Sequence, residues 1–452
     1  MGYQFFKCIT QSSLTTTKFA LVRKQVPLWN NCGVRFLGMY DLCVVGAGMI
    51  GSAAAKYATR TPNTSVCLIG QSELKNRADN GSGIWGAHYD ESRVVRASDP
   101  DPIWTHLARL SVGRFREIEE RSGIQFFHEV GTLWVGEGEY FCKATSVTYQ
   151  EKTGVNVLNS NDLHSKYPYL TFNSKDNGVL EKSHAGYLNP RKLVQAQIYL
   201  AQKNGCDYLD DIVKSVSREN TSNGTAVMEV LTEKGKRVQC RKVLIATGAF
   251  TDFRSLLPGL KVQQNLITLT VTHAEITEEV AMSMLREMPC VLYSGYGHPD
   301  WFPEFPRYDN GMTGFYMTPP IRYPDDRYYV KLGHFRDTLN HELKSAREVG
   351  DLYKYGNQDL GEKTVQFMKT LLKGIPIKKW KSDSCVTACT PSGRPYIDMV
   401  HEQLGVAVGG NGFAAKSSDE IGRASAGMII NGWDSPLPHD AFKLRATPLS
   451  LL

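Results

Sequence analysis

Three glycines near the start of the first apolar region have a spacing that suits phosphate binding. Gly46, Gly48 and Gly51 form the pattern G-x-G-x-x-G. In such a turn the first two glycines let the backbone approach a pyrophosphate, and the third permits close packing between helix and strand. A following helix adds the positive end of its dipole. The pattern therefore predicts a dinucleotide site, with a purely structural glycine turn as the alternative.

One part of the dinucleotide fingerprint is missing. An acidic residue is expected at the end of the second strand, where it binds the ribose 2′-OH. Gly70 and Gln71 stand there instead, and Glu73 follows slightly late. This weakens a prediction of NAD more than one of FAD, whose site draws on several loops. Gln71 or Glu73 is the candidate for the ribose contact.

The flanking residues provide the elements that such a turn needs. Residues 40–45 and 65–70 are short apolar runs typical of strands in a parallel sheet, and residues 52–58 are good helix formers. Strand, glycine turn, helix and strand fit within about 30 residues, which is the size of one βαβ unit.

Further along, the periodicity predicts additional helices and strands. We expect an amphipathic helix over 102–121 and a helix over about 413–431. Strands are expected at 132–136, in a meander formed by 213–216, 226–232 and 237–240, at 243–249, and in a hairpin of 316–324 with 328–333.

Strands that interrupt βαβ units indicate a mixed α/β (α+β) chain with two interleaved domains. We expect a Rossmann-like dinucleotide-binding domain built discontinuously from 40–100, 180–260 and 385–445. The substrate domain, a mixed sheet, would comprise 101–179 and 261–384.

The net charge of +6 is concentrated in the leading segment, 1–39, which carries five basic residues, is rich in Ser and Thr, and has no acidic residue. This composition is typical of a mitochondrial transit peptide. The alternatives are a disordered tail or a true start at Met39, with a cytoplasmic or peroxisomal location. The remaining chain has 47 basic and 46 acidic residues, which argues against a nucleic-acid binder.

The ten cysteines include no CxxC pair and no cluster with metal-ligand spacing, so we expect free thiols and no metal site. No run of about 18 apolar residues predicts a membrane span.

Five segments, in order, carry a resemblance to a known family. They are the turn 46–51, residues 88–96, residues 246–249, residues 331–334, and Cys385 with Asp398 and the glycine loop 410–412. Over residues 40 to about 430 the chain resembles the FAD-dependent amine and amino-acid oxidases of the D-amino-acid oxidase superfamily, and is similar to monomeric sarcosine oxidase. The resemblance implies FAD as cofactor, with Thr247 and Gly248 in its site.

The resemblance also implies roles for three cations. Arg93 and Arg96 would lie at the reactive face of the flavin, with Arg96 binding a substrate carboxylate as a bidentate fork. Lys331 would promote the reaction with O₂ through its positive charge. The alternatives are surface arginines and an outward-facing lysine on an edge strand.

Other residues are assigned in the same way. Cys385 matches the cysteine that the family joins to the flavin by a thioether; a buried structural cysteine is the alternative, and Cys389 is a competitor. Gly410, Asn411 and Gly412 match the closing glycine loop, although Asn411 replaces the usual His. Lys416 comes later in the chain than the family's carboxylate-binding lysine. The resemblance therefore assigns Arg96 to the substrate carboxylate more firmly than it assigns Lys416. Tyr89 is a possible pocket residue, whereas His334 ranks low.

We therefore predict a monomeric FAD-dependent oxidase of a secondary amine or N-methyl amino acid, which uses O₂ and releases H₂O₂. Two rivals remain: a dehydrogenase that passes electrons to a mitochondrial acceptor, and a flavin-bound assembly factor without catalysis. The sequence does not name the amine.

Overall fold

The glycine turn lies between the strand and helix that the sequence predicts. In the computed structural model, which describes residues 39–75, 81–150, 155–220, 223–254, 256–334 and 343–451, the chain begins with β1 (Tyr40–Val45), α1 (Met49–Ala58) and β2 (Val66–Ile69). The two strands pair in parallel. The predicted leading segment 1–39 lies outside the described residues except for Met39.

Alternation along β1 explains why both faces of its sheet are covered. Leu42 and Val44 pack into the apolar cluster that contains the alanines of α1, whereas Cys43 and Val45 pack on the opposite face. A strand that is apolar from Leu42 to Val45 therefore suits this central place in a parallel sheet.

The first sheet has eight strands in the described part of the chain. Its order is β10-β11-β12-β1-β2-β9, and β20 with β19 continues it from β12. The remaining strands of this sheet are β9 (Asp207–Leu209), β10 (Val213–Asn220), β11 (Ala226–Thr232), β12 (Arg237–Ile245), β19 (Tyr396–His401) and β20 (Leu404–Val408).

The predicted meander is present, but two of its predicted strands are one. The runs 237–240 and 243–249 together give the single strand β12, which ends at Ile245. Its first half pairs antiparallel with β11, and its second half pairs in parallel with β20. The change of partner along one strand joins the meander directly to the parallel sheet.

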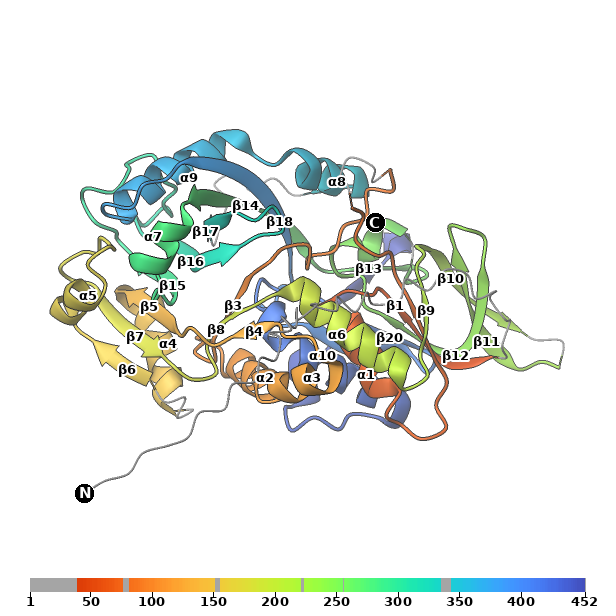
Figure 1. The fold of residues 1–452 in the computed structure, drawn as a ribbon. Coiled ribbons are helices and arrows are strands. Elements are labelled where there is room, and N and C mark those ends of the chain that lie inside the picture. Colours follow the sequence, from red (N-terminus) through yellow and green to blue (C-terminus); the bar gives the residue numbers. More distant parts are fainter. Residues whose placement is uncertain are drawn as a thin grey trace, which may run out of the picture. The chain divides into compact units, whose positions relative to one another are not determined.

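Helices α1, α6 (Pro190–Lys203) and α10 (Ala414–Asn431) pack together beside this sheet, and α2 (Pro102–Val112) packs on α10 (Figure 1). The contact between α1 and α10 is close, because a Cβ on Gly422 would lie 2.4 Å from the Cβ of Ala53. The predicted helix 413–431 is thus confirmed.

The predicted single helix 102–121 is wrong. It consists of α2 and α3 (Phe115–Ser122), separated at Gly113 and Arg114. Arg114 donates to Asp419 at 2.7 Å and to Glu420 at 2.6 Å. These acids lie on α10, so the break falls next to Gly113, a weak helix former, at a residue that pairs with a distant helix.

The second sheet also has eight strands within the described ranges, in the order β18-β14-β17-β16-β15-β5-β7-β6. The strands are β5 (Thr132–Gly136), β6 (Val155–Leu158), β7 (Asn177–Glu181), β14 (Asn265–Ile276), β15 (Cys290–Gly295), β16 (Thr313–Arg322), β17 (Tyr328–His334) and β18 (Lys379–Cys389). The predicted strand 132–136 and the hairpin formed by β16 and β17 are confirmed.

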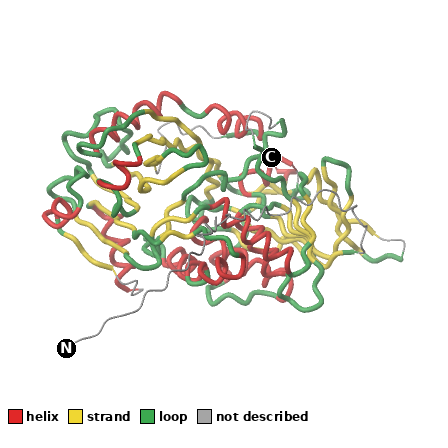
Figure 2. The backbone as a smooth tube through the Cα atoms, in the orientation of Figure 1, coloured by secondary structure: helices red, strands yellow, loops and turns green. Residues whose placement is uncertain are grey.

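Five helices accompany these strands in the described residues: α4 (Gly138–Gln150), α5 (Ser160–Lys166), α7 (Glu278–Ser283), α8 (Ala346–Tyr355) and α9 (Gln358–Leu371). Helix α9 packs along β14 and β18. Figure 2 shows the strands of both large sheets in yellow among the red helices. The core of the second sheet is aromatic, and Phe305 stacks on Phe367 with ring centroids 3.7 Å apart.

Two smaller sheets complete the described strands. One has the order β3-β8-β4 and consists of β3 (Arg93–Val95), β4 (Phe127–His128) and β8 (Gly186–Leu188); the other pairs β13 (Leu260–Val262) with β21 (Ala446–Pro448). Short 3₁₀ helices are η2 (Gly248–Arg254), η3 (His439–Phe442) and η4 (Leu449–Leu451). Strand β3 matters for the site because it carries Arg93.

The fold class is therefore mixed α/β, as predicted. The first sheet draws its strands from 40–69, 207–245 and 396–408, and the second from 132–181 and 265–389. Residues 39–452 form one compact unit, so the exact domain boundaries stay a prediction. Among the described residues, no helix combines the length and apolarity needed to cross a membrane.

Candidate active site

The three glycines of the turn are needed for different reasons. Gly46 has φ of +105°, and a Cβ there would lie 2.5 Å from the carbonyl oxygen of Ala246. A Cβ on Gly51 would lie 1.8 Å from the carbonyl oxygen of Gly46. Packing within the protein thus explains why positions 46 and 51 require glycine. A Cβ on Gly48, at the start of α1, would have no atom within 4 Å. This leaves space for a ligand beside the helix N-terminus.

The missing acid at the end of β2 has a steric cause. A Cβ on Gly70 would lie 2.4 Å from the backbone nitrogen of Ala47, so no side chain fits at this position. Glu73 forms a bidentate ion pair with Arg191 at 2.6 Å for both contacts, and Arg191 also contacts Glu91 at 2.7 Å. The role of Glu73 in ribose binding stays a prediction.

Two predicted cofactor segments border the glycine turn and β18. Thr247 and Gly248 follow Ala246, which contacts the turn, and the Thr247 hydroxyl lies 3.0 Å from that of Thr251. Gly248 has φ of +55°.

The second of these segments is the loop of Gly410, Asn411 and Gly412. The Asn411 amide NH donates to the carbonyl of Ala388 at 2.9 Å, and its side-chain oxygen accepts from the Thr390 amide at 2.8 Å. These bonds fasten the loop to the strand that carries Cys385.

Arg93 and Lys331 share one buried carboxylate. Lys331 Nζ donates to Asp90 Oδ2 at 2.8 Å and to the carbonyl of Ser92 at 2.5 Å, and its side chain is 1% exposed. Arg93 donates to the same Asp90 oxygen and to the carbonyl of Ala87 at 2.9 Å. Cys385 lies within electrostatic reach of both cations. The structure thus brings Arg93, Lys331 and Cys385 together.

Burial and charge act in opposite directions on this group. Burial raises the pKa of Asp90, but Lys331 and Arg93 outweigh it and hold that pKa well below its ordinary value. Burial lowers the pKa of Lys331, and the attraction of Asp90 only partly offsets this. With Lys331 and Arg93 both protonated in their ion pairs with Asp90, the group carries two positive charges and one negative charge.

A tyrosine and a histidine extend this group. Tyr323 donates its hydroxyl to Asp90 Oδ1 at 3.0 Å and lies 3.0 Å from His273 Nε2. All three are buried. We call Asp90, Arg93, Lys331, Tyr323 and His273 the Lys331 cluster. Sequence reasoning missed Asp90, Tyr323 and His273.

Arg96 lies in a separate group. Its Nη2 is 3.3 Å from Asp99 Oδ2, and Lys416 Nζ is 3.5 Å from the same oxygen. Glu181 lies within electrostatic reach of both cations and accepts from the backbone amides of Ala97 and Ser98 at 2.8 and 2.7 Å. We call Arg96, Asp99, Lys416 and Glu181 the Arg96 cluster. The late position of Lys416 therefore does not separate it from Arg96.

Sequence reasoning found the cations of both clusters but not their counter-ions. One signal was present: each arginine has an aspartate three residues away, Asp90 before Arg93 and Asp99 after Arg96. Both pairs form ion pairs in the structure.

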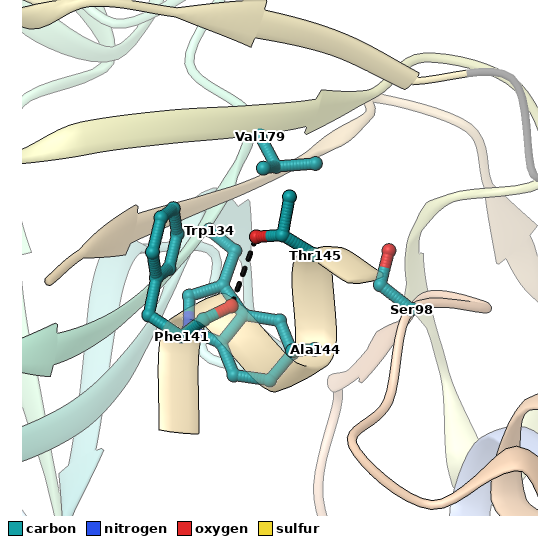
Figure 3. A pocket seen from close by; sticks show the side chains of 6 residues that line it. All are labelled: Ser98, Trp134, Phe141, Ala144, Thr145 and Val179. Atoms are coloured by element: carbon teal, nitrogen blue, oxygen red, sulfur yellow. Dashed lines mark hydrogen bonds between the residues drawn. The ribbon is translucent and has the colours of Figure 1, made fainter. Parts of the chain in front are cut away.

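A narrow hollow flanks the Arg96 cluster. Its lining consists of Ser98, Trp134, Phe141, Ala144, Thr145 and Val179 (Figure 3). The Arg96 guanidinium lies 5.1 Å from the centre of the Trp134 ring. The hollow is too narrow for a water molecule, so it is a gap in the packing beside the cluster and not a substrate cavity.

Two further predicted residues, Tyr89 and His334, have distinct surroundings. Tyr89 packs against Trp85 and His88, and its prediction as a substrate-binding residue stays untested. His334 is buried 4.4 Å from the Phe305 ring and bonds to Thr364 at 3.2 Å. Burial lowers the pKa of His334 to about 3. These contacts agree with its low rank as a catalytic candidate.

Comparisons with known proteins give matches over most of the chain. Residues 41–428 match the family described as FAD dependent oxidoreductase. A putative sarcosine oxidase from Caenorhabditis elegans is 23% identical over 393 residues, covering 86% of this chain and 93% of that protein. The N-methyl-L-tryptophan oxidase of Yersinia pestis (strain Pestoides F) is 22% identical over 411 residues, covering 90% and 98%.

Solved structures show the same fold. NikD, described as an unusual amino acid oxidase essential for nikkomycin biosynthesis, aligns with a TM-score of 0.69 at 17% identity, covering 91% of this chain and 99% of that one. The L-proline dehydrogenase of P. horikoshii aligns with a TM-score of 0.67 at 15% identity, covering 90% and 96%.

The residues present fit FAD. Gly48 leaves space beside the N-terminus of α1, where a pyrophosphate binds in this type of turn. His88 Nδ1 is buried without a hydrogen-bond partner in the described part of the chain. Burial lowers the pKa of His88 to about 3, so the ring is neutral at pH 7. The match spans most of the chain, and the chain belongs to the FAD-dependent oxidoreductase (DAO) family.

Proposed function

We propose that the chain is an oxidase of a secondary amine or N-methyl amino acid. Bound FAD supplies the acceptor for the two electrons that leave the C–N bond. The amine becomes an imine, water hydrolyses the imine, and O₂ takes up the electrons with two protons to give H₂O₂. The names of the two curated relatives, a putative sarcosine oxidase and an N-methyl-L-tryptophan oxidase, support this substrate class.

The observation that carries the proposal is the charge of the Lys331 cluster. Arg93 and Lys331 are opposed only by Asp90 among the groups that they contact in the described residues, which leaves a net positive charge in a buried place. A fixed positive charge stabilises the negative charge that develops when O₂ is reduced. Asp90 holds the ammonium of Lys331 in place, so the charge needs no reorganisation during the reaction.

Arg96 and Lys416 support binding of the substrate. They are buried donors beside the rings of Trp134 and Phe413. In the proposal they orient the end of the substrate that does not react.

Cys385 is proposed as the covalent attachment point for the flavin. Its closeness to Arg93 and Lys331 supports this, and burial raises the pKa of the competitor Cys389, which disfavours its thiolate. After acid precipitation, yellow fluorescence should remain with the unaltered protein and with Cys389→Ser. It should be released from Cys385→Ser. Release of all flavin from the unaltered protein would refute the covalent bond.

The leading segment supports mitochondrial targeting as a further part of the proposal. A fusion of residues 1–39 to a fluorescent reporter should localise to mitochondria, and a diffuse cytosolic signal would contradict this.

The function is tested by anaerobic mixing of the holoenzyme with a panel of secondary amines and N-methyl amino acids, followed by admission of O₂. We expect bleaching of the flavin absorbance and then reoxidation with one H₂O₂ per amine. Reduction with slow reoxidation by O₂ but fast reoxidation by an artificial acceptor would indicate a dehydrogenase. Failure of every amine to reduce the flavin would refute catalysis on this substrate class.

A further inference from the structure

The Arg96 cluster already contains a carboxylate between its two cations. Asp99 Oδ2 lies 3.3 Å from Arg96 Nη2 and 3.5 Å from Lys416 Nζ. The three side chains are 7%, 3% and 2% exposed for Arg96, Asp99 and Lys416. A substrate carboxylate that bound both cations would have to take the place of this oxygen.

The charges of the cluster are balanced without a ligand. Arg96 and Lys416 face Asp99 and Glu181, and Glu181 is also buried. Burial raises the pKa of Glu181, but the two backbone amides that donate to it, together with Arg96 and Lys416, favour its ionised form. A substrate carboxylate would therefore add a third negative charge to a buried group with two positive charges, which is strongly unfavourable.

The cluster nevertheless lacks acceptors. Arg96 Nε and Lys416 Nζ have no hydrogen-bond partner at normal distance in the described residues, although both side chains are more than nine-tenths buried. The contact between Lys416 and Asp99 is longer than an ordinary N–H···O bond. Buried donors of this kind call for an acceptor from outside the protein, and a neutral acceptor provides it without disturbing the charge balance.

We infer that the substrate presents a neutral hydrogen-bond acceptor to Arg96 and Lys416, such as an amide or ester carbonyl or a hydroxyl, and not a carboxylate. This inference rests on the proposed amine oxidation and narrows its substrate class. Asp99 is the specificity-determining residue, because it occupies the position that a substrate carboxylate would otherwise take.

The first experiment compares matched substrates on the unaltered holoenzyme. Sarcosine is paired with N-methylglycinamide, and N-methyl-L-tryptophan with its amide. We expect the amide of each pair to reduce the flavin with a kcat/KM roughly tenfold to a hundredfold higher, because like charges juxtaposed with Asp99 disfavour the acid. Equal or better use of the acids would overturn the inference. If neither member of any pair reduces the flavin, the proposed function fails and the binding experiment below decides the inference.

The second experiment measures binding without turnover. Propionate and propionamide are titrated into the holoenzyme, and their Kd values are read from the change in flavin absorbance. We expect propionamide to bind more tightly. In Asp99→Asn, which keeps the shape but removes the charge, the Kd of propionate should fall about tenfold while that of propionamide changes little. An unchanged preference in this variant would contradict the role of Asp99.

A matched control separates charge from folding. Asp101 lies two residues away, caps α2 and pairs with Arg394 at 2.7 Å. Asp101→Asn should leave the ratio of the two Kd values unchanged. If Asp99→Asn does not fold, the substrate and ligand pairs on the unaltered protein still decide between acid and amide.

Discussion

Each of the two clusters combines an arginine and a lysine with buried carboxylate, but the clusters differ in how completely these cations are hydrogen-bonded. In the Lys331 cluster, Asp90 Oδ2 accepts from Lys331 at 2.8 Å, and Tyr323 donates to the other oxygen at 3.0 Å. In the Arg96 cluster, the ion pairs are longer, at 3.3 and 3.5 Å, and two donors lack acceptors in the described residues. In the first cluster Asp90 and both cations are hydrogen-bonded within the protein, while His273 Nδ1 has no partner in the described residues, and the two cations outnumber the one carboxylate. The second cluster is balanced in charge and needs a ligand to complete the hydrogen bonds of its two cations. We therefore assign fixed electrostatics to the first and ligand recognition to the second.

The largest expected effect comes from breaking the Lys331 cluster. Asp90→Asn should lower the free energy of unfolding by about 3–5 kcal/mol, because it leaves Lys331 without its buried counter-ion. Chemical denaturation of both proteins at pH 7 measures this. Asp325→Asn, at an exposed carboxylate that faces Lys381, is the control and should cost less than about 1 kcal/mol.

The same variant has a defined pH dependence. The folded-state pKa of Asp90 lies below its unfolded value, so its stabilisation is fully present above the unfolded pKa of about 3.9 and is lost as pH falls toward the folded pKa. The difference in stability between the two proteins should shrink only in acid. If the difference in free energy of unfolding stayed constant down to pH 3, Asp90 would not be stabilised by an ion pair in the folded state.

A smaller effect is expected from Tyr323. Tyr323→Phe removes one donor to the buried Asp90 carboxylate and should cost about 1.5–3 kcal/mol, the range for hydrogen bonds to charged groups. Denaturation at pH 7 tests this against Tyr329→Phe, which removes a 2.9 Å bond to the exposed Asp325 and should cost less. Equal losses would show that Tyr323 does not support the cluster.

The smallest effect concerns the Arg96 cluster. Burial lowers the folded-state pKa of Lys416 from 10.5 to about 8. Between these values the folded state binds fewer protons than the unfolded state, so stability should rise with pH by up to about 1.4 kcal/mol per unit. Lys416→Met should lose this rise, whereas Lys381→Met, at an exposed lysine, should keep it. If the stability of Lys416→Met still rises with pH in this range, a group other than Lys416 is responsible for the rise.

The sequence predicted elements with local causes and failed where distant partners decide. The turn, β1, α1 and the β16–β17 hairpin follow from spacing and alternation. The break between α2 and α3 lies at Gly113 and Arg114, and the pairing of Arg114 with the acids of α10 is a long-range contact that no local pattern predicts. In the same way, Arg93, Arg96 and Lys331 were recognisable as cations, but only the folded chain shows that Asp90 and Asp99 oppose them.

The separate roles of the two clusters, reaction with O₂ and amine binding, can be measured directly. Stopped-flow kinetics follows flavin reduction by the amine and flavin reoxidation by O₂ as separate half-reactions. Lys331→Met should slow reoxidation of the reduced flavin by O₂ by roughly 10²–10³-fold and leave reduction by the amine nearly unchanged. Arg96→Ala should weaken amine binding in the reductive half-reaction and leave reoxidation nearly unchanged. Normal reoxidation in Lys331→Met, or an effect of both variants on the same half-reaction, would contradict the account.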